Sequence, residues 1–289
     1  MAKKFLILII FISVLIGLGV FFKAKKIEVN QHLEKASQKK ELGFEGNLLS
    51  STSSLKKESF KEPLISKEKI ELITKDKVKI VGNFIKVKDS KKAVLLLHMM
   101  PSTKESFKEF SEILAENGFS SLAIDLRGHG ESTQTLEGKK LDYRYFSDWE
   151  HQQSIYDLES ASEFLENQGF LKENQYLVGA SIGANLALEF GSLNPEIKKI
   201  ILISPGLNYR GLSSQTFLKK ITSSQELLFI SSKKDFYAYE SSKKLASDCL
   251  KLKISCKEIY LEGKSHGTDI FKENKEIYQK LILFLKAKN

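Results

Sequence analysis

The chain has 289 residues, of which 42% are hydrophobic and 28% charged, a composition that excludes collagen-like, mucin-like and wholly disordered proteins. Its two cysteines are too few for a disulfide-framework miniprotein and lack the further Cys or His ligands of a zinc site. The net charge is +9, but the chain contains only three arginines and no basic stripe interleaved with aromatics. We therefore expect no nucleic-acid partner.

The first predicted element is a membrane anchor. Residues 5–22 contain no charge, and 15 of these 18 residues are Phe, Leu, Ile or Val. As a helix they would be about 27 Å long, close to the hydrocarbon thickness of a bilayer. The alternative is a cleaved signal peptide, but Phe21-Phe22-Lys23-Ala24 offers no small-x-small cleavage site. The sequence thus favours a single-pass transmembrane helix within residues 1–24, with membrane contact through residues 5–22.

Residues 25–62 are rich in Lys, Glu, Ser and Gln, with too few apolar residues to bury a face, and predict a flexible stalk. Lysines on both sides of the anchor nearly balance the positive-inside rule. Because a short N-terminal tail usually stays in the cytoplasm, we expect the domain formed by residues 63–289 to be extracytoplasmic, in a periplasm or at the cell surface.

Beyond residue 63, short apolar runs alternate with longer stretches of helical periodicity. Strands are predicted at 69–74, 78–87, 93–97, 119–124, 175–178, 199–204, 226–231 and 256–261, and helices at 106–117, 149–168, 182–193, 212–221, 237–250 and 268–286. Strand–helix–strand repetition requires right-handed crossovers, so we predict one α/β domain with a mostly parallel eight-stranded sheet and helices on both faces. Ligands of such sheets bind beyond the carboxyl ends of the strands.

A candidate nucleophile lies at one of these strand ends. Gly179-Ala180-Ser181-Ile182-Gly183 follows a predicted strand and opens a predicted helix, which is the context of a G-x-S-x-G nucleophile elbow. The turn is tight enough to require small neighbours, and it holds the serine at a helix N-terminus, where developing negative charge is favoured. The pattern therefore identifies Ser181 as the candidate nucleophile.

A serine hydroxyl needs a base, and the base needs a carboxylate that fixes its tautomer. His266 is the one histidine after Ser181, and it follows the last predicted strand. Asp235 follows the strand that ends at residue 231, whereas Asp248 falls on the next helix and Asp269 lies only three residues beyond the histidine. We therefore predict a triad of Ser181, Asp235 and His266, in the chain order of the α/β-hydrolases.

Two further motifs carry a resemblance to the α/β-hydrolase superfamily, in its serine esterase and serine aminopeptidase-like branch. Leu97-His98-Met99-Met100-Pro101 resembles the H-G-x-P segment of that family, and residues 125–132, DLRGHGES, resemble its D-x-R-G-x-G-x-S turn. The resemblance extends from about residue 69 to the C-terminus. It implies an oxyanion hole formed by the backbone N–H groups of Met100 and Ile182. Met99 stands where the family has Gly, which leaves Met99 as the alternative to Met100.

The resemblance also directs attention to the walls of the site. The connection between the strands at 199–204 and 226–231 has only about twenty residues, room for one short helix, which predicts a minimal lid and an open cleft. The aromatic cluster Leu141–Phe146, together with Trp149, either packs on the domain or lines an acyl pocket. The candidate pocket residues are Met99, Tyr143, Phe146 and Trp149.

These features predict a membrane-anchored serine hydrolase that cleaves carboxylic or thio esters through an acyl-serine intermediate. No metal or organic cofactor is required by this chemistry. A serine aminopeptidase-like amide hydrolase is one alternative, since the same triad cleaves amides. A catalytically silent, anchored binding module is another. The sequence leaves open the oligomeric state and whether Cys249 and Cys256 form a local bridge.

Overall fold

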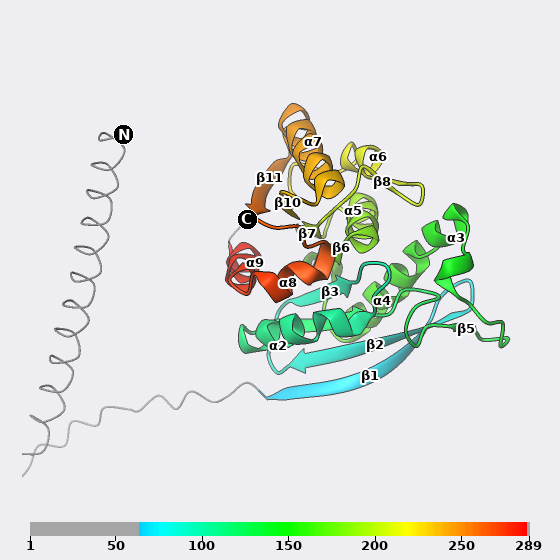
Figure 1. Cartoon of the computed structure of the whole chain (residues 1–289). Coiled ribbons are helices and arrows are strands. Elements are labelled where there is room, and N and C mark those ends of the chain that lie inside the picture. Colours follow the sequence, from blue (N-terminus) through cyan, green and yellow to red (C-terminus); the bar gives the residue numbers. More distant parts are fainter. Residues whose placement is uncertain (1–63, 288–289) are drawn as a thin grey trace, which may run out of the picture. The chain divides into compact units, whose positions relative to one another are not determined.

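The computed structural model describes residues 64–287, so the predicted anchor and stalk lie outside the described residues. Figure 1 shows one twisted sheet with helices on both faces. The main path of the sheet runs β1 (Ile65–Ile73), β2 (Val78–Val87), β4 (Ser120–Ile124), β3 (Ala93–Leu97), β6 (Gln175–Ala180), β7 (Lys199–Ile203), β10 (Glu226–Ser232) and β11 (Ser255–Leu261). The pairs β1–β2 and β2–β4 are antiparallel and the other pairs along this path are parallel.

The eight predicted strands are therefore present, in a mixed but mostly parallel sheet. A ninth strand, β5 (Gln134–Thr135), pairs with β2 and was not predicted. It has only two residues, too short to show an alternating pattern in the sequence.

The central strands are buried along their whole length because helices cover both faces. Neighbouring residues of one strand enter different cores: Leu95 and Leu97 pack on one side, Val94 and Leu96 on the other. The first core includes side chains of α4 (Ile155–Asn167), α5 (Ile182–Leu193) and α7 (Phe236–Leu252). The second includes side chains of α2 (Lys108–Glu116), α8 (Ile270–Glu273) and α9 (Ile277–Lys286). These two layers of packing hold the carboxyl ends of the strands at one edge.

Three predicted helices are broken or shortened. The helix predicted at 149–168 is two helices, α3 (Asp148–Gln152), which begins at a capping box formed by Ser147 and Glu150, and α4. The helix predicted at 106–117 begins as a 3-10 turn, Lys104–Phe107, before α2. The helix predicted at 268–286 consists of a 3-10 turn, Gly267–Asp269, followed by α8 and α9. Residues 272–276 are all polar, so they cannot continue a buried stripe.

The helix predicted at 212–221 is wrong in its first part. The chain there forms a hairpin of β8 (Asn208–Tyr209) and β9 (Leu212–Ser213), and only then α6 (Ser214–Leu218). Arg210 and Gly211, with φ of 53° and 80°, supply the two positive-φ residues that a two-residue type I′ turn requires. The connection thus carries a hairpin and one short helix, and within residues 64–287 no separate multi-helix cap follows β7.

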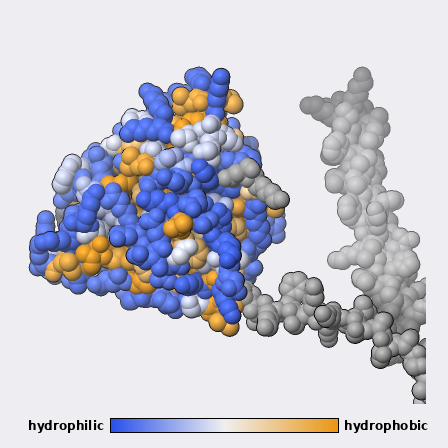
Figure 2. Space-filling view, turned by 180° about the vertical axis from the view of Figure 1, so that it is seen from behind, coloured by the Kyte–Doolittle hydropathy of each residue, from blue (hydrophilic) through white to orange (hydrophobic). Residues whose placement is uncertain are grey.

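The surface is mostly polar. Figure 2 shows a largely hydrophilic face with small, separate hydrophobic patches. Within residues 64–287, no helix combines the length and apolarity that a membrane crossing needs.

The structure joins Cys249, at the end of α7, to Cys256, in β11, by a disulfide with a Cα–Cα distance of 6.4 Å. The Cys249 side chain is fully buried in the first core. The bridge fastens the last turn of α7 to the edge strand of the sheet.

We predict that replacing both cysteines by alanine lowers the free energy of unfolding by about 2 kcal/mol, because the open chain regains conformational entropy in the unfolded state. The midpoint of thermal unfolding should fall by about 4–8 °C. Reductant should lower the midpoint of the wild type to a similar value and leave the double variant unchanged. A wild-type midpoint indifferent to reductant would contradict the prediction.

Candidate active site

Ser181 occupies a strained turn between β6 and α5. Its backbone has φ 55° and ψ −119°, and its N–H donates to the Ile203 carbonyl on β7 at 2.8 Å. The two glycines of the motif are required by space, because a Cβ on Gly179 would lie 2.1 Å from the Gly183 carbonyl oxygen and one on Gly183 would lie 2.3 Å from that of Leu97. A positive φ at a residue other than glycine is costly and persists where the surroundings impose it. The turn holds the largely buried Ser181 side chain at the carboxyl end of the central strands.

His266 and Asp235 lie beside Ser181, each on the segment that follows one of the last two strands, β11 and β10. The Nε2 atom of His266 lies 2.8 Å from Ser181 Oγ, and its Nδ1 atom lies 2.6 Å from Asp235 Oδ2. Asp235 follows β10 at the N-cap position of α7, with no capping hydrogen bond from its side chain, while His266 lies on the loop after β11. The sheet therefore brings together the three side chains of the predicted triad in one hydrogen-bonded series.

The loop after β3, which carries Met99 and Met100, the alternative candidates for one predicted oxyanion donor, is fastened to the loop after β4. His98 is fully buried, its Nδ1 lies 2.8 Å from the Met99 carbonyl oxygen, and its Nε2 accepts the Leu126 N–H at 3.0 Å. The imidazole is therefore neutral, with its proton on Nδ1. Burial, together with the neighbouring His129, lowers the pKa of His98 to about 4.

A buried ion pair strengthens the same connection. The ammonium of Lys104 lies 2.7 Å from an Asp125 carboxylate oxygen and 2.8 Å from one of Glu131. Asp125 also accepts the backbone N–H groups of Lys104 and Glu131. Hydrogen bonds from Lys104 and Lys69 lower the pKa of Glu131 to about 2, so Glu131 is ionised at neutral pH.

The predicted oxyanion donors lie on two elements. Ile182 is the first residue of α5, and its N–H is among those that have no partner within a helix. The Met99 carbonyl accepts from Ser102 N–H at 2.9 Å as well as facing the His98 ring, so the Met100 N–H on the same peptide group points away from this turn. The Met99 side chain lies against the loop of His266, since a Cβ on Gly267 would come 2.5 Å from its sulfur.

Met99 lies against the loop of His266, whereas the predicted aromatic pocket residues have other surroundings. Tyr143 stacks on His129 with ring centroids 3.8 Å apart, and Phe146 packs edge-on against His151 at 5.4 Å. Trp149 is 66% exposed on α3. In the described part of the chain, no hydrogen bond or ring contact joins Tyr143, Phe146 or Trp149 to the three clustered side chains. For Tyr143 and Phe146 these contacts favour packing on the domain, whereas Trp149 is exposed.

Sequence reasoning missed Tyr209, on β8. Its ring lies edge-on to the His266 imidazole, with centroids 6.4 Å apart and planes at 87°. Burial raises the pKa of the Tyr209 phenol, the Asp235 carboxylate adds to this effect, and the neighbouring Ser181 side chain opposes it. The following Arg-Gly pair was the available signal for the hairpin that places this ring, but it is a weak one.

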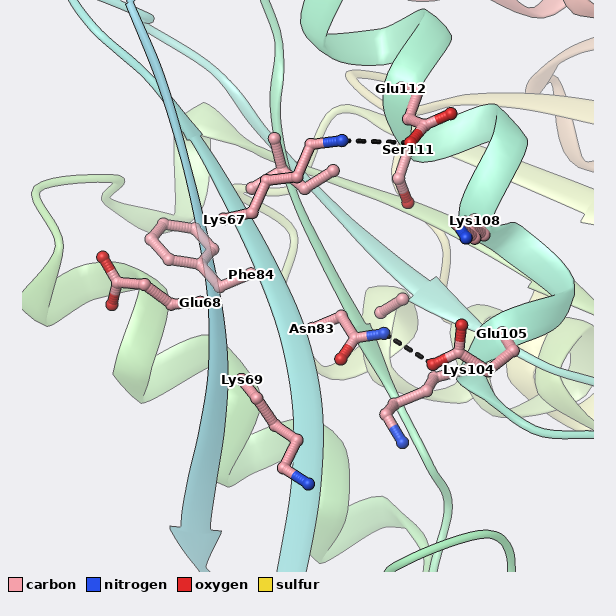
Figure 3. Close-up of a pocket in the computed structure, with 12 residues that line it drawn as sticks. Lys67, Glu68, Lys69, Asn83, Phe84, Lys104, Glu105, Lys108, Ser111 and Glu112 are labelled. Atoms are coloured by element: carbon pink, nitrogen blue, oxygen red, sulfur yellow. Dashed lines mark hydrogen bonds and ion pairs between the residues drawn. The ribbon is translucent and has the colours of Figure 1, made fainter.

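Two hollows lie near these elements. A groove of about 590 Å³ between α2 and α8 begins at Met99 and Thr268, beside the loop of His266. Figure 3 shows another cavity, of about 240 Å³, between β1–β2 and α2, lined in part by Lys67, Phe84 and Glu112. Neither hollow is lined by any of the three clustered side chains. Within residues 64–287, no group of His, Cys, Asp or Glu side chains is arranged to hold a metal ion.

Solved structures share this fold. An esterase from Pyrococcus furiosus superposes with a TM-score of 0.63 at 20% identity, over 77% of this chain and 92% of its own. A dienelactone hydrolase from Anabaena variabilis gives 0.59 at 17% identity, over 78% and 98%. An acylaminoacyl peptidase from Pyrococcus horikoshii gives 0.62 at 16% identity, over 78% and 43%. No curated protein matches the sequence significantly.

The strand order, the turn at Ser181 and these neighbours define an α/β-hydrolase. Residues 88–251, more than half of the chain, match the model of the serine aminopeptidase S33 family. The chain belongs to this family of hydrolases.

The environment of His98 makes stability depend on pH. Its pKa is about 4 in the folded chain and near its usual 6.5 when unfolded, so the unfolded state takes up the proton first as pH falls. We predict that the free energy of unfolding falls by about 2 kcal/mol between pH 7 and pH 5 from this residue alone. Urea unfolding at the two pH values measures the change.

His98→Asn is the matched variant. It should be less stable than the wild type at pH 7 but lose less stability on going to pH 5. The slope that remains combines His129 and His151, whose lowered pKa values act in the same direction as that of His98, with Asp157 and Glu189, whose pKa values are raised by burial and act in the opposite direction. An equal loss in both proteins would show that His98 is not the group responsible.

Proposed function

We propose that the protein is a serine hydrolase that cleaves carboxylic or thio esters through an acyl-enzyme intermediate on Ser181. The observation that carries this proposal is the hydrogen-bonded series from Ser181 Oγ through His266 to Asp235, at 2.8 Å and 2.6 Å. This is the arrangement in which a base can take the proton of a serine hydroxyl while a carboxylate stabilises the resulting imidazolium.

In the proposed reaction, Asp235 accepts the Nδ1–H of His266 and so directs the Nε2 lone pair at the Ser181 hydroxyl. As Ser181 Oγ attacks the substrate carbonyl, its proton moves to His266 Nε2 and a tetrahedral oxyanion forms. The N–H of Ile182 and that of Met100, or alternatively Met99, hold this oxyanion. Each such donor contributes about 3–4 kcal/mol to stabilisation of the transition state.

Two steps complete the turnover. The tetrahedral intermediate expels the alcohol or thiol, which receives the proton from His266. A water molecule, deprotonated by His266, then attacks the acyl-serine; the bond from the acyl carbon to Ser181 Oγ breaks, Oγ takes the proton back from His266, and the acid is released.

A serine aminopeptidase-like amide hydrolase is the second candidate. The description of the matched family supports it, and one structural neighbour is named as an acylaminoacyl peptidase. Two other neighbours are named as an esterase and a dienelactone hydrolase, which supports ester cleavage. Within residues 64–287, the connection after β7 forms only a hairpin and one short helix, so it places no large cap over the approach to Ser181. An uncapped approach is compatible with ester hydrolysis.

A fluorophosphonate probe tests for a reactive serine. We predict that the wild type is labelled and that Ser181→Ala is not, because the probe requires an activated nucleophile. His266→Ala should also lose labelling, and Ser181→Ala should lower kcat for an ester by about 10⁴-fold or more. Ser192→Ala, at the far end of α5, is the matched control and should be labelled like the wild type. Absence of wild-type labelling would favour the binding module.

Substrate class is measured with p-nitrophenyl esters of graded acyl length beside aminoacyl p-nitroanilides. The proposal expects the larger kcat/KM on the esters. A larger kcat/KM on the anilides, lost in Ser181→Ala, would assign the protein to the amide hydrolases instead.

We also propose that residues 5–22 anchor the protein in a membrane and that the hydrolase domain faces an oxidising, extracytoplasmic compartment. The Cys249–Cys256 disulfide supports this side, since such bridges persist in oxidising compartments and are rare in the cytoplasm of mesophiles. The uncharged run of 18 residues supports the anchor.

Protease treatment of intact cells or spheroplasts tests the orientation. The full chain should fractionate with membranes, resist extraction by high salt, and be cleaved by external protease. A variant lacking residues 1–24 should be soluble after expression and retain esterase activity. Protection of the wild-type domain until the membrane is lysed would place it on the cytoplasmic side.

A further inference from the structure

We propose that Tyr209 is a further catalytic residue, whose hydroxyl donates a hydrogen bond to the leaving-group oxygen of the ester. This inference rests on the proposed function and adds a specificity for the alcohol part of the substrate. It starts from the position of the Tyr209 phenol beside both Ser181 and His266.

The Tyr209 hydroxyl is able to donate a hydrogen bond to a substrate. Its acceptor on the backbone is the Ser204 carbonyl oxygen at 3.5 Å, a distance at the limit of a hydrogen bond. Burial raises the pKa of this phenol, so it keeps its proton throughout the neutral range. A half-buried, protonated hydroxyl with a weak protein partner is available to an oxygen of the substrate.

The ring is held by the helix that also carries the nucleophile. Asn185, one turn after Ser181 on α5, donates to the carbonyl oxygens of Gly206 and Leu212 at 3.0 and 2.9 Å and accepts the Gly206 N–H at 3.1 Å. A Cβ on Gly206 would come 2.6 Å from the Tyr209 ring, so the backbone supports the ring directly.

Neighbours on either side fix the hairpin. The Tyr237 hydroxyl bonds to both the N–H and the carbonyl of Asn208, at 3.1 and 3.0 Å. On the other side, the Gln152 side chain of α3 donates to the Arg210 carbonyl at 3.2 Å. Tyr209 is therefore clamped between α7, α5 and α3 and is not carried on a free loop.

The strand order shows on which side of Ser181 the residue Tyr209 lies. In the sheet, β6 lies between β3 and β7, so the loop after β3 with the predicted oxyanion donors flanks Ser181 on one side. Tyr209 follows β7, which lies on the other side of β6. Strands β10 and β11, which precede Asp235 and His266, lie on that side as well. The leaving group departs on the side of His266, because that residue protonates it. Tyr209 therefore faces the leaving group and not the carbonyl oxygen.

The step balances without a second proton donor. When the tetrahedral intermediate collapses, the bond between the acyl carbon and the leaving oxygen breaks, and its electron pair stays on that oxygen. The oxygen takes the proton from His266 Nε2. Tyr209 keeps its own proton and stabilises, by a hydrogen bond, the negative charge that develops on the oxygen during cleavage. This help matters most for a poorly stabilised alkoxide and least for a p-nitrophenolate.

Tyr209→Phe tests the inference, since it keeps the ring and removes the hydroxyl. The assay compares kcat/KM for ethyl butyrate and p-nitrophenyl butyrate, which share the acyl group and differ in the leaving group. We expect kcat/KM to fall about 10–100-fold for the ethyl ester, somewhat less than the loss for an oxyanion donor. For the p-nitrophenyl ester the fall should stay within about threefold.

Tyr260→Phe is the control, because Tyr260 lies on β11 with its hydroxyl paired to Glu258, and it should change neither value. Thermal unfolding checks that each variant is folded. An equal loss on both esters, or no loss on the ethyl ester, would overturn the role of Tyr209 while labelling of Ser181 remained. If Ser181 itself is not labelled in the wild type, the proposed function fails first.

Discussion

The hydrogen bond between Ser181 and His266 joins residues 85 positions apart, and no local structure could bring them together. It depends on the parallel strands β6, β10 and β11, whose carboxyl ends meet at one edge of the sheet. Strands β6 and β10 keep this alignment because they are buried between two helical layers, where alternate side chains fill separate cores, and the more exposed edge strand β11 is aligned by its pairing with β10. Slippage of one strand by a single residue would exchange its two faces and move the loop that follows it. The chemistry proposed for the site is therefore a property of the whole sheet.

Much of this arrangement could be predicted from the sequence. Continuous apolar runs such as residues 93–97 identify strands that are covered on both faces, and the alternation of short apolar runs with helical stretches places the other principal strands. The spacing of Gly179, Ser181 and Gly183 reports a steric requirement of one turn, which the close approach of their backbones explains. Asp235 and His266 could be chosen because chain order and strand ends restrict the candidates. Such signals are readable because each follows from local sterics or from the period of a strand.

Other parts could not be predicted, for physical reasons. The hairpin of β8 and β9 turns at Arg210, which adopts a positive φ that its residue type does not favour. Tyr209 therefore gave no sign that it would lie near His266. The aromatic residues at 143–149 were recognised as a cluster, but their partners, His129 and His151, come from other elements. Composition shows that a side chain is large and apolar, whereas the surface that it covers is decided by tertiary packing.

Ser204, at the end of β7, supports both halves of this edge of the site. Its backbone has a positive φ of 49°, its hydroxyl accepts the Gly267 N–H at 2.9 Å beside His266, and its carbonyl faces the Tyr209 hydroxyl at 3.5 Å. The proposed alcohol-side wall at Tyr209 and the loop of His266 thus share one support. Under the proposed mechanism, remodelling this wall for a bulkier alcohol would also disturb the imidazole, so broader selectivity would come at the expense of turnover.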